Sequence, residues 1–250
     1  LHAVVGGSIG GMNVLDWVRR DPDRLARAVP IAATPRPRAQ AVAFDAIARR
    51  AITTDPHWNG GRYYDGPSPD HGLMLARQLG LVRYLSSSSF DEKFGAGPAA
   101  TCQTMPFPSE PFTETGTYYA VESFLDYQGE QFVQRFDANS YLSLTRALDE
   151  FDLADDAACE AAALAGFDGE AFLISFTSDW YFPVARSRVL ESAFRETDAA
   201  VVHHTVASDY GHDAFLAQPS LFTQRLRSFL DAGVAGLESD PPSGGDRPSG

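Results

Sequence analysis

The feature that most constrains the fold is at the start of the chain, where an apolar run passes through a glycine-rich turn into a helical pattern. Residues 1–5 are typical of a buried strand, and apolar residues recur at helical spacing over residues 14–18. The turn between them, residues 6–10, reads Gly-Gly-Ser-Ile-Gly and matches the pattern G-x-S-x-G. Its small residues permit a strained strand-to-helix turn that lifts the Ser8 hydroxyl above the sheet edge. Ser8 is therefore a candidate nucleophile.

The motif alone leaves two interpretations open, because glycine-rich turns between a strand and a helix also bind phosphate without any nucleophile. A nucleophile at such a turn requires an acid and then a histidine at the carboxyl ends of later strands. Asp179 follows the apolar run 171–176, and His212 follows the apolar run 199–206. The order Ser8, Asp179, His212 predicts a catalytic triad.

Each residue type suits its expected role. His212 would take the proton from Ser8 during attack, and Asp179 would fix the imidazole tautomer and stabilise the imidazolium. Considered one at a time, Asp179 could instead cap the helix after Pro183, and His212 could be a surface loop residue. His203 and His204 are competing candidates for the base, but they lie in the middle of an apolar run, where one would face the core and the other a covering helix, far from the strand end. His2, His57 and His71 have no acid and serine at matching strand ends and are expected to be structural or solvent-facing.

The strand patterns occur in two separate parts of the chain. Residues 1–34 and 167–232 are expected to form one α/β core, a mostly parallel sheet flanked by helices, because strands joined through helices pair in parallel. Helical periodicity within the second part covers residues 184–197 and 221–230. The tail, residues 233–250, has little to bury and is expected to be disordered.

The middle of the chain, residues 35–166, has a different character. Helical periodicity over residues 41–52, 72–85 and 121–151 predicts an inserted helical lid. Residues 95–116 are rich in Pro and Gly, with few aliphatic side chains, and are expected to form an irregular loop.

Composition excludes several classes of function. The formal charge is −13, with 33 acidic against 20 basic residues, so nucleic acid is not an expected partner. Cys102 and Cys159 have no CxxC spacing and no flanking histidine, which argues against both a metal site and a disulfide framework. No apolar run reaches the roughly 18 residues that suggest a membrane helix. A cytoplasmic protein that binds small molecules is expected.

Five segments together resemble one known family. They are Gly-Gly-Ser-Ile-Gly-Gly-Met at 6–12, Phe-Val-Gln-Arg-Phe-Asp-Ala-Asn-Ser-Tyr at 132–141, Leu-Asp-Glu-Phe-Asp-Leu at 148–153, Ser-Phe-Thr-Ser-Asp-Trp at 175–180 and Gly-His-Asp-Ala-Phe-Leu at 211–216. With them the chain resembles the homoserine O-acetyltransferase family across nearly everything from Ala3 to Leu230. The resemblance implies an enzyme of the α/β-hydrolase fold that moves an acetyl group from acetyl-CoA to L-homoserine through an acyl-Ser8 intermediate, in methionine biosynthesis. It implies no metal and no bound cofactor, since acetyl-CoA is a substrate.

The resemblance also implies roles that spacing does not reveal. Arg77 and Asp213 match family positions that hold homoserine. An arginine can bind the substrate carboxylate bidentately, and an aspartate beside the base can receive the ammonium group; the other explanation is a salt bridge between lid and core. In the family the lid forms much of a homodimer contact, so residues 35–166 are expected to do so here.

The chain departs from the family pattern at its start. It begins with Leu1 inside an apolar run, and the family has roughly a further third of chain before this point. We therefore expect an N-terminal truncation that removes the first strands of the sheet and one oxyanion-hole donor. The backbone N–H of Ile9 would supply one donor, and loss of another costs about 10²- to 10³-fold in rate. The chain alone is expected to be nearly inactive, because that donor is missing. It is also expected to be poorly soluble, because a sheet edge is unpaired.

Other functions remain open at this point. A triad does not decide whether an alcohol or water accepts the acyl group, so a serine or other-alcohol O-acyltransferase or an esterase would use the same residues. The acyl donor, acetyl or succinyl, is also open. A third interpretation is an inactive fragment of this fold that serves at most for dimer contacts.

Overall fold

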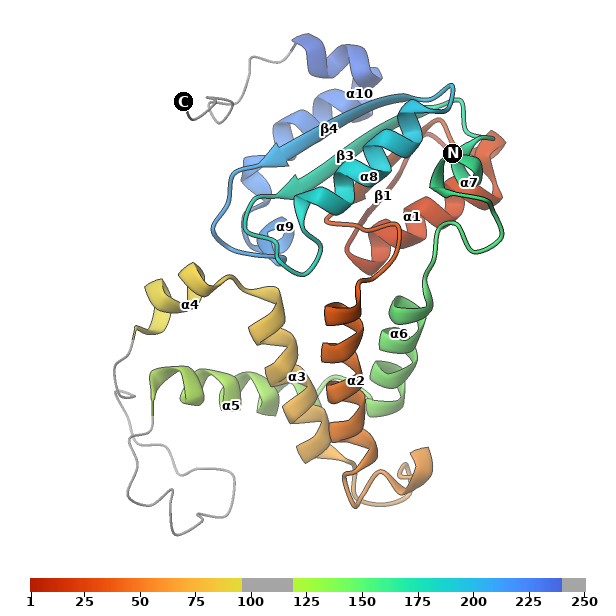
Figure 1. Cartoon of the computed structure of the whole chain (residues 1–250). Helices are drawn as coiled ribbons and strands as arrows, with labels where there is room; N and C mark the ends of the chain where they lie inside the picture. Colours follow the sequence, from red (N-terminus) through yellow and green to blue (C-terminus); the bar gives the residue numbers. More distant parts are fainter. Residues whose placement is uncertain (96–118, 240–250) are drawn as a thin grey trace. The chain divides into compact units, whose positions relative to one another are not determined.

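The computed structural model describes residues 1–95 and 119–239 and divides into two compact units (Figure 1). Leu1–Pro37 and Glu150–Gly250 form one unit, which we call the sheet unit. Arg38–Asp149 form the other, which we call the helical unit. The two-part α/β core and the inserted helical segment predicted from the sequence correspond to these units. The predicted irregular loop at 95–116 falls, from residue 96 on, outside the described residues.

The sheet unit is built on four parallel strands in the order β1-β2-β3-β4. Their bounds are Val4–Gly7, Arg27–Ile31, Glu170–Phe176 and Ala200–Val206. Because all four run in the same direction, their carboxyl ends meet at one edge of the sheet. Residues that directly follow β1, β3 and β4 are thereby brought to the same edge.

Helices cover both faces of the sheet, and the side chains of β3 alternate between them. Ala171 and Leu173 join one core cluster with α1 (Ile9–Arg20), α7 (Glu160–Leu164) and α8 (Val184–Arg195). Phe172, Ile174 and Phe176 join the other cluster with α10 (Thr223–Ser239). Burial on both faces explains why β3 is a continuous apolar run rather than an alternating one.

Among its described residues, the helical unit contains five α-helices and one short 3-10 helix, Asn59–Gly61. The α-helices are α2 (Ala39–Thr53), α3 (Asp70–Tyr84), α4 (Ser87–Phe94), α5 (Ala120–Val133) and α6 (Ala138–Glu150). The stretch 121–151, for which the sequence shows helical periodicity, forms two helices, α5 and α6. The chain breaks between α5 and α6 because the Asp137 carboxylate accepts a hydrogen bond from the Ser140 N–H at 2.7 Å, which starts a new helix.

The boundaries of the insertion also differ from those expected. The sequence predicted 35–166, whereas the helical unit ends at Asp149. Leu153 and Leu164 are fully buried in the core of the sheet unit, and this anchors the segment after α6 to the sheet. Periodicity along the chain does not reveal which core a buried residue joins.

The sequence predicted a disordered tail from residue 233, but helical structure continues beyond that residue. α10 continues to Ser239 through a turn at Gly233, whose φ is 65°. The Val234 N–H donates to the Glu170 carboxylate at 2.8 Å, and Leu237 is buried in the cluster around Phe172. This long-range packing orders residues that look unstructured in sequence. Residues 240–250 lie outside the described part of the chain.

The described ranges contain neither a candidate membrane helix nor a candidate metal site. Within residues 1–95 and 119–239, no helix is both long and apolar enough to cross a bilayer. In the same ranges, no group of three or more His, Cys, Asp or Glu side chains is placed to hold a metal ion.

The assignment of Leu153 to the sheet unit can be tested by stability. Leu153→Ala is expected to lower the free energy of unfolding by about 2–5 kcal/mol, because it opens a cavity in a fully packed core. Denaturant unfolding of the full-length protein measures this. Leu221→Ala is a matched control, because Leu221 is 43% exposed and its loss should change stability by less than about 0.5 kcal/mol. A similar small effect at Leu153 would contradict the assignment.

Candidate active site

Ser8 lies at a strained turn between β1 and α1. Its φ is 56° and its ψ is −122°, a conformation that residues other than glycine rarely adopt. The turn is possible because its neighbours are glycines: a Cβ on Gly6 would lie 2.2 Å from the Gly10 carbonyl oxygen, and one on Gly11 would lie 2.8 Å from the Ala33 Cβ. The Ser8 N–H donates to the Ile31 carbonyl at 2.9 Å, which ties the turn to β2. This is the geometry predicted from G-x-S-x-G.

Asp179 occupies the loop that follows β3 and is 3% exposed. Its Oδ1 accepts hydrogen bonds from the backbone N–H groups of Tyr181, at 3.0 Å, and Phe182, at 2.8 Å. α8 begins later, and the residue before it is Pro183, so Asp179 is not its N-cap. Two backbone donors fix one carboxylate oxygen and leave Oδ2 to face His212.

His212 joins the other two residues. Its Nδ1 lies 2.7 Å from Asp179 Oδ2, and its Nε2 lies 2.7 Å from Ser8 Oγ. The carboxylate can only accept, so Nδ1 carries the proton and Nε2 accepts from the serine hydroxyl. His212 is 2% exposed, so it is not a surface loop residue. The three residues predicted as a triad are thus brought into one hydrogen-bonded chain.

Aromatic rings enclose the imidazole of His212. Tyr181 and Phe182 approach it edge-on with ring centroids 5.1 Å away, and Phe215 does so at 6.0 Å. Apolar walls restrict the rotation of the ring and lower the local dielectric, which strengthens its hydrogen bonds.

Ile9 is the first residue of α1. The first N–H groups of a helix have no acceptor within the helix, and they carry the positive end of the helix dipole. Because Ile9 directly follows Ser8, its N–H is the group expected to face a charge that develops on an acyl carbonyl attached there.

The two residues assigned to homoserine by resemblance lie in different units. Arg77 lies on α3, where its guanidinium is 5.1 Å from the centre of the Phe132 ring and its buried Nε has no hydrogen-bond partner. Within the described part of the helical unit, no carboxylate forms an ion pair with Arg77. Asp213 follows His212 and precedes α9 (Ala214–Ala217). Their substrate roles remain predictions.

One arrangement was missed by sequence reasoning. His203 Nε2 lies 2.7 Å from Ser175 Oγ, and His203 Nδ1 lies 3.0 Å from Glu191 on α8. The contacts mimic a triad, but Ser175 is only 1% exposed, so a substrate could not reach it. Burial lowers the pKa of His203, although Glu191 opposes this change. His204 stacks on Phe172 with the ring centroids 6.4 Å apart. Both histidines lie in the middle of β4, away from its carboxyl end, as expected.

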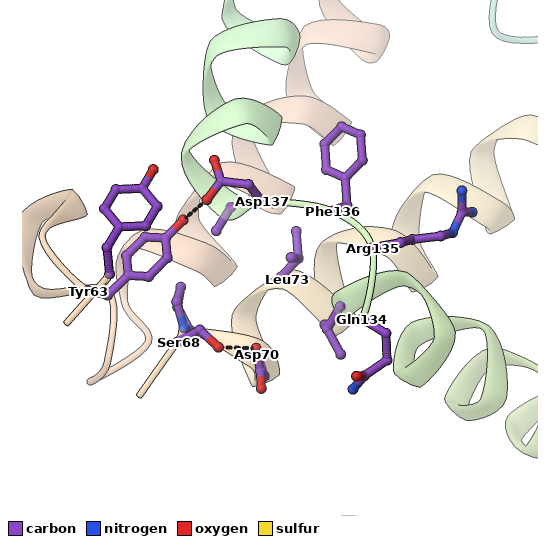
Figure 2. Close-up of a pocket in the computed structure, with 12 residues that line it drawn as sticks. Tyr63, Ser68, Asp70, Leu73, Gln134, Arg135, Phe136 and Asp137 are labelled. Atoms are coloured by element: carbon purple, nitrogen blue, oxygen red, sulfur yellow. Dashed lines mark hydrogen bonds between the residues drawn. The ribbon is translucent and has the colours of Figure 1, made fainter. Parts of the chain in front are cut away.

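A separate cavity of about 370 Å³ lies within the helical unit (Figure 2). Two pairs of its polar lining groups are hydrogen-bonded to each other: the Tyr63 hydroxyl donates to Asp137, and the Ser68 hydroxyl donates to Asp70 at 2.6 Å. None of the predicted site residues lines it. We therefore assign no ligand to this cavity.

Comparison with known proteins shows which fold family the chain resembles. A family model described as alpha/beta hydrolase fold matches residues 1–219. The homoserine O-acetyltransferase of Haloferax volcanii is 52% identical over 98% of this chain, and that of Natronomonas pharaonis is 55% identical over 94%. The chain spans 60% and 59% of the length of these two relatives.

Solved structures support the same fold. A homoserine O-acetyltransferase from Bacillus anthracis matches 92% of this chain and 60% of its own with a TM-score of 0.81 at 22% identity. The esterase E22 matches 92% of this chain and 61% of its own with a TM-score of 0.75 at 24% identity. At these identities the similarity establishes the fold alone.

Proposed function

Because this chain belongs to the α/β-hydrolase fold family, we propose that it carries the triad of an acyltransferase that moves an acetyl group from acetyl-CoA to the hydroxyl of L-homoserine. The observation that carries the proposal is the chain of two 2.7 Å contacts from Ser8 through His212 to Asp179. The homoserine acceptor is supported by relatives of that name at 52% and 55% identity. The proposal includes a cytoplasmic reaction in methionine biosynthesis, without metal or bound cofactor.

The first half-reaction acylates Ser8. His212 Nε2 takes the proton from Ser8 Oγ as the oxygen attacks the thioester carbonyl of acetyl-CoA. The negative charge on the tetrahedral intermediate is stabilised by the Ile9 N–H. When the carbon–sulfur bond breaks, the thiolate of CoA leaves with the proton held on His212, and acetyl-Ser8 remains.

The second half-reaction transfers the acetyl group. His212 Nε2 takes the proton from the homoserine hydroxyl, whose oxygen attacks the carbonyl of acetyl-Ser8. The ester bond to Ser8 breaks, and Ser8 Oγ recovers the proton from His212. Asp179 stabilises the imidazolium in both halves without itself taking the proton.

In this proposal Arg77 binds the homoserine carboxylate and Asp213 its ammonium group. A guanidinium matches a carboxylate in a planar, bidentate geometry, and Arg77 has no competing ion pair among the described residues of its unit. We also propose homodimer contacts through the helical unit. Several large apolar side chains are exposed there: Ile47, Leu75, Val82, Tyr127 and Leu144.

The proposal is tested by thiol release from acetyl-CoA by the full-length protein, with and without L-homoserine. Release that requires homoserine supports the acetyltransferase. Release without any acceptor would assign a hydrolase. Release with L-serine but not with L-homoserine would assign serine as the acceptor. Release from succinyl-CoA but not from acetyl-CoA would assign succinyl-CoA as the donor. No release with any pair would favour the inactive module.

A binding role for Arg77 predicts a change in KM. Arg77→Ala is expected to raise the KM for homoserine about 10- to 100-fold, because a charge-assisted bidentate contact is lost. The kcat should change far less, since the carboxylate is bound equally in the ground and transition states. Arg77→Lys should lie between, and the exposed Arg62→Lys should have no effect. An unchanged KM in Arg77→Ala would remove this role.

A further inference from the structure

Hydroxyl groups join the loop that carries Asp179 to the loop that carries His212. The parallel ladder between β3 and β4 has its last pair at Phe176 and Val206. One more backbone hydrogen bond follows, in which the Thr177 N–H donates to the Val206 carbonyl at 3.0 Å. Beyond this point the loops that follow β3 and β4 separate, and side chains provide the contacts between the two loops.

Thr177 provides the first of these contacts. Its hydroxyl donates to the carbonyl oxygen of Ser208 at 3.0 Å and accepts from the N–H of Ser208, also at 3.0 Å. One side chain therefore replaces the backbone partner that a longer strand would have offered to Ser208.

Ser178 provides the second contact. Its Oγ accepts a hydrogen bond from the Gly211 N–H at 2.8 Å. Gly211 has a φ of 85°, a conformation that glycine adopts without steric cost. Because Gly211 immediately precedes His212, this hydrogen bond fixes the direction in which the chain enters the imidazole residue.

The two loops need such a connection because Asp179 and His212 are positioned separately. The backbone N–H groups of Tyr181 and Phe182 fix Asp179 within its own loop. The 2.7 Å contact between Asp179 and His212 is possible only if the second loop keeps its place. A shift of about 1 Å in reacting groups can cost about 10²-fold in rate.

We propose that the hydroxyls of Thr177 and Ser178 are positioning residues that hold the His212 loop against Asp179. They act through Ser208 and Gly211 and not on the reacting atoms. The inference rests on the proposed triad chemistry at Ser8.

The test is the rate at which a fluorophosphonate labels Ser8 in the full-length protein. Ser8 Oγ bonds to phosphorus, fluoride leaves, and His212 takes the proton, so the rate reports the His212–Ser8 geometry without depending on any substrate. Ser178→Ala and Thr177→Val are each expected to slow labelling about 10- to 100-fold. Ser178→Thr keeps the hydroxyl and should restore most of the rate. The kcat for acetyl transfer should fall in parallel, with the KM for homoserine unchanged.

Thr197→Ala is the matched control. The Thr197 hydroxyl makes the same kind of contacts at the amino end of β4, to the Phe194 carbonyl at 2.7 Å and from the Ala199 N–H at 3.1 Å. Its loss should leave labelling unchanged. Equal slowing in Thr197→Ala would mean general loosening of β4 and would overturn the proposal.

The failures are distinguishable. If the wild type is labelled and the rates for Thr177→Val and Ser178→Ala are the same as for the wild type, the positioning role alone is overturned. If the wild type is not labelled at all, the triad itself is overturned. Circular dichroism establishes which variants are folded, and if Ser178→Ala does not fold, Thr177→Val and Ser178→Thr decide the outcome.

Discussion

Ser8→Ala is expected to lower the rate of acetyl transfer by about 10⁴- to 10⁶-fold, the range seen when a nucleophile is removed from an intact triad. His212 Nε2, 2.7 Å from Ser8 Oγ, would then have no hydroxyl to deprotonate, and no acyl intermediate could form. Homoserine-dependent thiol release from acetyl-CoA measures the loss. The alanine side chain is smaller than serine, so the fold should be kept.

Ser143→Ala provides the control for this substitution. Ser143 lies on α6 and is exposed, and its hydroxyl only donates to the Asn139 carbonyl within the same helix. The activity of the Ser143→Ala variant should match that of the wild type. If Ser8→Ala retained more than about one hundredth of the wild-type rate, acyl transfer would have to proceed directly between the substrates, and the covalent route would be wrong.

The second large effect is expected for Asp179→Asn, which should lower kcat by about 10⁴-fold with little change in KM. The two N–H groups of Tyr181 and Phe182 continue to require an oxygen at Oδ1. The amide nitrogen must therefore face His212 Nδ1 and donate to it. This forces the proton of the imidazole onto Nε2, which then cannot accept a proton from Ser8.

Asp198→Asn is the matched control for Asp179→Asn. Asp198 is exposed and lies just before β4, at the opposite edge of the sheet. Its substitution removes the same charge without touching the site, and the rate should not change. A small effect of Asp179→Asn would show that the imidazole finds its tautomer without the carboxylate, and that Asp179 is only a structural acid.

The strand-to-helix turn and the meeting of Ser8, His212 and Asp179 were predictable from the sequence because their causes are local or ordered along the chain. The glycines beside Ser8 are needed for contacts within a few residues, such as that between Gly6 and Gly10. Parallel strands bring the residues that follow them to one edge, so the order of Ser8, Asp179 and His212 sufficed to predict their meeting. The continuous apolar run of β3 likewise indicated a strand buried on both faces.

Tertiary structure alone decided the features that depend on partners distant in sequence. Leu153 and Leu237 join the sheet core through packing that no periodicity reveals, which moved the ends of the insertion and of the last helix. The hydroxyl of Ser178 meets Gly211 only because β3 and β4 are adjacent. A sequence specifies what each residue can contact at short range. The choice among many possible long-range contacts is made by the free energy of the whole packed core.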